Sequence, residues 1–186
     1  DVPFFWPRSC MLGYDGTVKE YLNENNEALT TTGRSSNYNN SSFTGNAMME
    51  WGRDGQIIWF KCVPDSNGKG GEYHFSNVKL DNDYHAWAFT DANGAITDHF
   101  YTSKYFGASD GTRMRSISGL SNYVNNTAAS EISIARANNQ TSSVIWDTTT
   151  FAQWQLINGL LILMAGTTQT QVAYGYGRCS SSNTEA

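Results

Sequence analysis

The sequence has little charge, little proline and few cysteines. Lysine and arginine together number 12 and aspartate and glutamate 17, so the formal net charge of the 186 residues is -5. With aromatic residues at 13%, this is not the composition of a charge-rich disordered chain. Nucleic-acid binding is not expected either. It depends on clustered lysine and arginine side chains that displace phosphate counterions, and this sequence has no such cluster.

Long apolar runs are also missing. The longest, residues 156–165, is interrupted by Asn158 and Gly159, whereas a membrane-spanning helix needs about 20 apolar residues. We therefore expect no membrane insertion. Cys10, Cys62 and Cys179 form no CxxC pair and no metal-ligand spacing, so three reduced thiols, or one disulfide and one free thiol, both remain open.

Small polar residues are abundant instead. Asn (18), Ser (19), Thr (18) and Gly (17) supply 72 of the 186 residues. These residues favour turns, and the accompanying aromatic residues favour strands. The composition predicts an α+β protein that is rich in loops and built on short antiparallel strands.

Turn signals organise the first part of the chain, residues 1–104. Residues 14–17, with an Asp-Gly pair, predict a turn between two short strands. The polar segment 23–46 predicts either a surface loop or a short helix at 24–29 followed by a loop.

Further strands are expected along the same part of the chain. Residues 47–51 and 56–63 are predicted to form a hairpin through the Asp-Gly turn at 52–55. A second turn is expected at 64–68, and a strand at 85–89 that runs into a turn.

Two helices are predicted in the second part, residues 105–186. The first covers about 127–139 with Thr127 as its N-cap, and the second covers about 149–165 and ends at Gly166. The second helix is apolar nearly all round, so we expect it to be buried, and it carries one periodic face. That face comprises Phe151, Trp154, Ile157, Leu161 and Met164.

No catalytic or metal-binding constellation stands out. His74, His85 and His99 show no spacing that would make them converge, and no nucleophile motif is present. We expect no catalytic residue, no metal and no cofactor. The six tryptophans either fill a core or stack on sugar rings, and we expect core positions for most of them. They are Trp6, Trp51, Trp59, Trp87, Trp146 and Trp154.

Several segments, taken in order, resemble a family of bacteriophage tail and virion proteins with a C-type-lectin-like (formylglycine-generating-enzyme-like) fold. The matching segments are PFFWPRSCMLGYDGTVKEYLN (3–23), GNAMMEWGRDGQIIWFKCVPD (45–65), DNDYHAWAF (81–89), DHFYTSKYFG (98–107), MRSISG (114–119), EISIARANN (131–139) and WQLINGLLILMAGTTQTQVAYGYG (154–177).

The resemblance implies one lectin-like domain over 1–186, whose variable loops bind partners on a rigid frame. It implies a non-enzymatic virion component, such as a tail fibre, a tail tip or a head decoration. Its partners would be a host surface receptor, glycan or protein, and other virion proteins, and it would be a homo-oligomer in the extracellular particle. The alternatives are a purely structural virion scaffold, a bacterial surface adhesin of the same fold and, as a weaker alternative, a carbohydrate-active enzyme.

Two departures from the family matter. Family members continue well past the segment that matches 172–177, so the lectin-like core is either incomplete in this chain or completed by another one. The formylglycine-generating branch also uses a reactive cysteine pair that the three cysteines do not reproduce. That departure argues against oxidase activity.

Binding residues are expected in three polar loops, at 30–46, 64–72 and 107–112. Loop amides, hydroxyls and aromatic rings suit a polyhydroxylated or peptidic partner. The candidates are Tyr38, Asn39, Asn40, Phe43, Asn67, Lys69, Ser109 and Asp110. An enzyme would instead need carboxylates from Glu50, Asp81, Asp83 or Asp98 to pair in a concave site.

Overall fold

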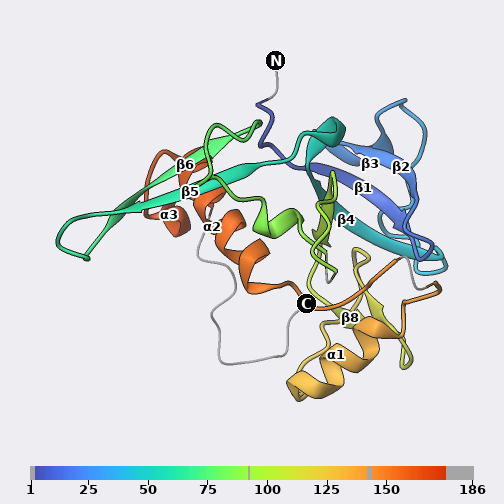
Figure 1. Cartoon of the computed structure of the whole chain (residues 1–186). Helices are drawn as coiled ribbons and strands as arrows, with labels where there is room; N and C mark the ends of the chain where they lie inside the picture. The colour runs from blue at the N-terminus through green and yellow to red at the C-terminus, as the bar shows by residue number, and fades with distance from the viewer. Residues whose placement is uncertain (1–2, 92, 142–143, 175–186) are drawn as a thin grey trace. The chain divides into compact units, whose positions relative to one another are not determined.

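The computed structural model describes residues 3–91, 93–141 and 144–174. The chain forms two compact units, each built from separate stretches of sequence. We call residues 7–51 and 101–148 the sheet unit, and residues 3–6, 52–100 and 149–174 the hairpin unit. Figure 1 traces both along the chain.

The sheet unit is built on a five-stranded sheet with the strand order β3-β2-β1-β4-β7. β1 pairs antiparallel with both β2 and β4, and β2 pairs antiparallel with β3. The strands are β1 (Arg8–Gly13), β2 (Val18–Asn23), β3 (Asn26–Thr30), β4 (Gly45–Trp51) and β7 (Phe100–Ser103).

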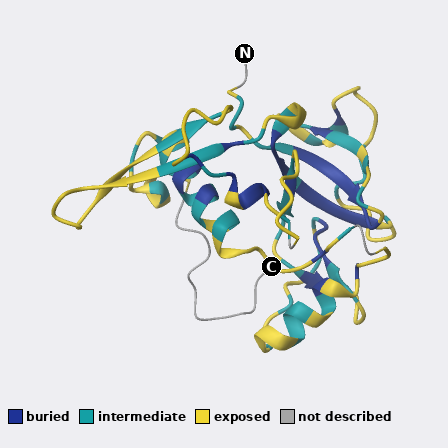
Figure 2. Ribbon diagram, in the orientation of Figure 1, coloured by how far each residue is buried: buried dark blue, intermediate teal, exposed yellow. Residues whose placement is uncertain are grey.

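Both faces of the central strand β1 are buried. Cys10 and Leu12 belong to a core cluster with Trp146, while Met11 belongs to a second cluster with Ile117. Because alternate residues of a strand point to opposite faces, a strand covered on both sides reads as a nearly continuous apolar run. This explains the apolar sequence of β1, and Figure 2 shows β1 and β4 mostly in the colour of buried residues.

A small hairpin and one helix complete the sheet unit. β8 (Ala108–Ser109) pairs antiparallel with β9 (Met114–Arg115). α1 (Ala128–Arg136) begins after its N-cap Thr127, whose side chain accepts a hydrogen bond from the Ser130 amide. The predicted helix near 127–139 and its cap are confirmed.

The hairpin unit contains a two-stranded antiparallel hairpin of β5 (Trp59–Pro64) and β6 (Gly71–Ser76). Its turn is the predicted one at 64–68, closed by a hydrogen bond of 2.9 Å from the Gly68 amide to the Asp65 carbonyl. Two 3-10 helices belong to the same unit, η1 (Arg53–Gly55) and η2 (Trp87–Phe89).

Helix α2 (Phe151–Ala165) packs against this hairpin, and α3 (Thr170–Tyr174) follows it. A capping box of Thr150 and Gln153 starts α2, and Gly166, with φ of 63°, ends it in the left-handed conformation that glycine tolerates. The predicted helix is therefore confirmed.

The predicted burial of α2 is confirmed only in part. Its buried residues are Leu156, Gly159 and Leu160, whereas Phe151 and Trp154 from the predicted core face are exposed. A Cβ on Gly159 would lie 2.8 Å from the Phe75 ring, so the hairpin contacts the helix at its small residue and not along its aromatic stripe.

Three local predictions need correction. Residues near 24–29 are neither helix nor loop but mostly strand β3, because Leu22 and Thr30 pair across β2 and β3. The hairpin predicted through 52–55 does not form, since β4 and β5 belong to different sheets. The strand predicted at 85–89 is a single bridge at His85 followed by η2.

The described residues thus form a mixed α+β structure with antiparallel strands and three α-helices, which confirms the predicted class. None of the helices in these residues has the length and apolar character that crossing a membrane requires.

Candidate functional site

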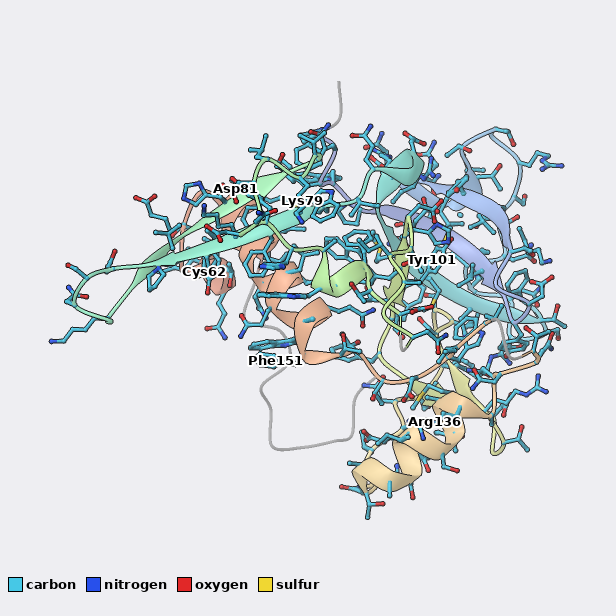
Figure 3. The ribbon with its side chains drawn as sticks, in the orientation of Figure 1. Cys62, Lys79, Asp81, Tyr101, Arg136 and Phe151 are labelled. Carbon is cyan, nitrogen blue, oxygen red and sulfur yellow. The ribbon has the colours of Figure 1, made fainter. Side chains whose placement is uncertain are left out.

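A groove of about 490 Å³ lies on the hairpin unit, along β5 and the segment that precedes η2. We call it the aromatic groove. Its lining residues are Phe60, Lys61, Cys62, Val63, Pro64, Asp83, His85 and Trp87. Cys62 and the neighbouring Asp81 are labelled beside the hairpin in Figure 3.

Two stacked rings form the most prominent feature of the groove. The rings of His85 and Trp87 lie 4.4 Å apart at 6°, and the edge of Phe60 meets Trp87 at 5.9 Å. Although it is stacked, Trp87 is 55% exposed. An indole that neighbouring rings hold in place and that remains more than half exposed offers a surface on which a ligand can stack.

Backbone pairing fixes this platform to the hairpin. The amides of Phe60 and His85 each donate to the other residue's carbonyl at 2.9 Å. On the adjoining strands Phe60 pairs with Phe75, and the Phe60 ring stacks with Tyr73 at 5.8 Å. The aromatic groove is therefore supported by paired strands and their stacked aromatic side chains, and not by a loop.

A charged cluster borders the groove. The Lys61 ammonium nitrogen Nζ lies 3.0 Å from an Asp81 carboxylate oxygen and 3.2 Å from one of Asp83. The hydrogen bond to Asp81, followed by that to Asp83, raises the pKa of Lys61, and the hydrogen bond from Lys61 lowers the pKa of Asp81. Lys61 and Asp81 therefore stay charged at neutral pH, and the side chains of Asp81 and Asp83 are exposed enough to accept hydrogen bonds.

Five of the eight predicted binding residues are exposed. Asn67 and Asp110 bond the amides of their own turns, Asn67 to Lys69 at 2.8 Å and Asp110 to Thr112 at 3.0 Å. Asn67 and Lys69 belong to the hairpin unit, and the other six residues to the sheet unit. The exposed residues are Asn39, Asn40, Asn67, Lys69 and Asp110.

The remaining three predicted residues are partly buried. Tyr38 and Phe43 pack against the core cluster that contains Met11. The Ser109 hydroxyl accepts a hydrogen bond of 3.0 Å from the amide of Gly111. These side chains hold their own loops in place, which leaves them less available to a ligand.

Arg115 joins two of the predicted loops within the sheet unit. Its guanidinium donates to the Phe43 carbonyl at 2.9 Å and to the Ser41 carbonyl at 3.2 Å, and it lies 3.5 Å from the Asp110 carboxylate. The loops at 30–46 and 107–112 therefore meet at one buried cation. Sequence reasoning did not find this contact, because Arg115 lies more than 70 residues from Ser41 and Phe43.

Glu50, a candidate carboxylate for an enzyme, lies inside the sheet unit. It is buried and accepts hydrogen bonds from Arg8 at 2.6 and 2.8 Å, from Tyr21 at 3.2 Å and from Tyr101 at 3.3 Å. Burial, and then the charge of Glu50, raises the pKa of Tyr101 well above its ordinary value. These hydrogen bonds all join residues of the sheet unit to one another, as expected for a network with a structural role.

Among the residues that the structure describes, no three acidic, histidine or cysteine side chains are placed to share a metal ion. Cys10 is a buried free thiol and Cys62 an exposed one, while Cys179 lies outside the described residues.

The expectation that most tryptophans are core residues holds only in part. Trp51 and Trp146 are buried, but Trp6, Trp87 and Trp154 are exposed. The aromatic groove was therefore missed at the level of sequence. The available signal was the spacing of His85 and Trp87, since residues two apart in an extended segment project to the same side.

Comparison with known proteins gives no match: no family model, no curated protein and no solved structure is similar to this chain.

Proposed function

We propose that the chain is a non-enzymatic component of a bacteriophage virion, and that it binds a host cell surface through the aromatic groove. The observation that carries the binding role is the exposed Trp87, stacked on His85 beside a cluster of three charged side chains. A concave site with an aromatic wall and a few convergent polar groups is the usual form of a ligand-binding site.

The assignment to a virion, as a tail fibre, tail tip or head decoration, rests on the ordered resemblance of the sequence. The C-type-lectin-like fold is part of the same proposal. The mixed α+β structure with short antiparallel strands supports it. The extracellular particle would be the location of such a protein.

Binding fits the charged cluster better than catalysis does. A glycosidase needs one carboxylic acid with a raised pKa, which stays protonated until it donates its proton. Lys61 instead lowers the pKa of Asp81 and also pairs with Asp83. The side chains of Asp81 and Asp83 are therefore suited to accept hydrogen bonds from a ligand.

The test is binding of the labelled full chain to whole bacterial cells of candidate host strains. Trp87→Ala is expected to reduce cell binding at least about tenfold, because it removes the stacking surface. Phe106→Ala is the matched control, since Phe106 is an exposed ring outside the groove. Equal binding by the wild type and Trp87→Ala would exclude the groove as the receptor site, and a purely structural scaffold would then account for the chain better.

The proposal includes a homo-oligomer, and helix α2 is the surface that supports it. Phe151 and Trp154 stack at 6.3 Å on its exposed side, and Leu163 is exposed further along. Residues 148–177 contain no charged side chain. Aromatic residues without charge are typical of the centre of an interface between subunits.

Native mass spectrometry of the full chain tests the oligomer. Trp154→Glu is expected to shift the distribution toward the 20.6 kDa monomer, since it places a charge in the interface, whereas Phe106→Glu, at an exposed ring outside α2, serves as a control. A wild-type chain that is wholly monomeric would contradict this part of the proposal.

A further inference from the structure

We propose that the aromatic groove binds an uncharged sugar ring, which stacks on the exposed indole of Trp87 and hydrogen-bonds to Asp83 and Lys61. This inference rests on the proposed function and names its ligand. It follows from three features of the groove: the shape of the platform, the chemistry of its rim and the sign of its charge.

The platform suits a flat, weakly polar face. His85 stacks on Trp87 at 6°, which holds the indole in a fixed orientation, and Trp87 remains 55% exposed. The apolar C–H face of a pyranose matches an open indole in size and polarity. Because the indole is already ordered, stacking costs little side-chain entropy.

The rim suits hydroxyl groups. The Asp83 side chain is 75% exposed although it pairs with Lys61, so its carboxylate can accept hydrogen bonds from sugar hydroxyls. The Lys61 ammonium has three N–H donors, two of which meet Asp81 and Asp83, and the third can reach a hydroxyl oxygen. Polar groups beside an aromatic wall provide the orientation that stacking alone does not.

The charge of the rim selects against acidic sugars. Lys61 contributes one positive charge and Asp81 and Asp83 contribute two negative ones, so the cluster carries one net negative charge. The chain as a whole has a formal net charge of -5. A uronic or sialic acid would meet repulsion in the groove, whereas a neutral hexose or N-acetylhexosamine would not.

An extended peptide added to the edge of β5 fits less well. Phe60 already uses both backbone groups on His85, and Pro64 has no N–H to donate. Strand addition depends on a row of free backbone groups, and β5 offers few of them beside the groove.

The experiment measures binding of the full chain to an array of neutral hexose and N-acetylhexosamine oligosaccharides, of sialylated and uronic acid oligosaccharides, and of extended peptides. We expect affinity for neutral glycans only. Trp87→Ala should weaken it about tenfold or more, Trp87→Phe should retain most of it, and Phe106→Ala should leave it unchanged.

A charge reversal at the rim tests the selectivity. The double variant Asp81→Asn/Asp83→Asn leaves Lys61 as the one charged member of the cluster, so it should weaken neutral-glycan binding and raise acidic-glycan binding several-fold. An unchanged preference in this variant would overturn the role of the rim.

The outcomes separate this inference from the proposed function. Binding to acidic glycans or to peptides but not to neutral glycans overturns the sugar assignment, as does the absence of binding on every arm. If cell binding still depends on Trp87 in that case, the proposed function stands with another ligand. If cell binding is also independent of Trp87, both fail.

Discussion

The two units place similar side chains in opposite environments. In the sheet unit, Glu50 is buried with Arg8 and two tyrosine hydroxyls, and the core strands are covered on both faces. In the hairpin unit, carboxylates and an indole lie at the surface around a groove. The contrast teaches that polar groups serve as internal supports in one unit and are available to a ligand in the other.

The physical reason lies in the sheets. A five-stranded sheet with covered faces can enclose a polar network and satisfy it, whereas a two-stranded hairpin has no interior of its own and is stable only when it packs on another element. The hairpin obtains that support from α2, through Phe75 and Gly159. Of its remaining aromatic residues, Trp59 and Phe60 are partly buried and Tyr73 is exposed.

The largest expected difference between the units concerns their cysteines. Burial, and then the charge of Glu50, raises the pKa of the Cys10 thiol to about 12, while Cys62 is exposed in the aromatic groove. With Cys179 replaced by Ser, native Cys10 should react with a thiol reagent at pH 8 at least about 10³-fold more slowly than Cys62. Stopped-flow labelling of single-cysteine variants measures the two rates.

Unfolding in urea is the control for this comparison, since both thiols should then react at similar rates. Equal rates in the native protein would show that Cys10 is as accessible as Cys62, which would contradict the burial of β1 in the sheet unit.

The buried Glu50 network should dominate the stability of the sheet unit. Glu50→Ala leaves the Arg8 guanidinium without its 2.6 Å partner in a part-buried site, and we expect a loss of about 3–5 kcal/mol in the free energy of unfolding. Urea denaturation measures the loss. Glu72→Ala is the control, because Glu72 pairs with His74 at an exposed site and should cost less than about 1 kcal/mol.

A double replacement of Arg8 and Glu50 by Met removes both charges and should recover much of the stability that Glu50→Ala loses. A loss below about 1 kcal/mol for Glu50→Ala would contradict the view that this network supports the sheet unit.

Within the hairpin unit, helix α2 allows a buried and an exposed leucine to be compared. Leu160 is fully buried and Leu163, on the same helix, is 46% exposed. In the monomer, Leu160→Ala should lower the free energy of unfolding by about 2–5 kcal/mol and Leu163→Ala by less than about 1 kcal/mol. Urea titrations of the two variants give both values, and similar losses would mean that the apolar side of α2 is also covered.

Local chemistry allowed several elements to be predicted. Thr127 and Gly166 mark helix ends through capping interactions that involve only neighbouring residues. The turns at 14–17 and 64–68 depend on short-range glycine and aspartate patterns in the same way. Sequence reasoning is reliable where the cause of a structure lies within a few residues of it.

Elements that depend on distant partners could not be predicted. The predicted pairing of β4 with β5 does not form because β4 pairs with β1, which lies far away in the sequence. The apolar residues of α2 likewise gave no indication of which side Phe75 would cover. The candidate site has the same limitation. Nothing local shows that Trp87 is exposed while Trp51 and Trp146 are buried, since exposure depends on what the rest of the chain packs against.

The smallest expected effect comes from an exposed ion pair of the sheet unit, which sharpens the contrast with buried Glu50. Hydrogen bonds from Lys19 and then from Thr17 lower the pKa of the Asp15 carboxyl to about 2. A folded-state pKa below the unfolded value of about 3.9 adds stability above that pH, and the stability is lost as the pH falls toward 2. Asp15→Asn should therefore make the loss of stability between pH 4 and pH 2 smaller, and urea denaturation at each pH measures that loss. Lys19→Met should have a similar effect, because it removes the largest cause of the lowered pKa of Asp15. Since the pair is exposed, added salt should reduce the difference between wild type and variant, whereas the effect of Glu50→Ala should persist in salt.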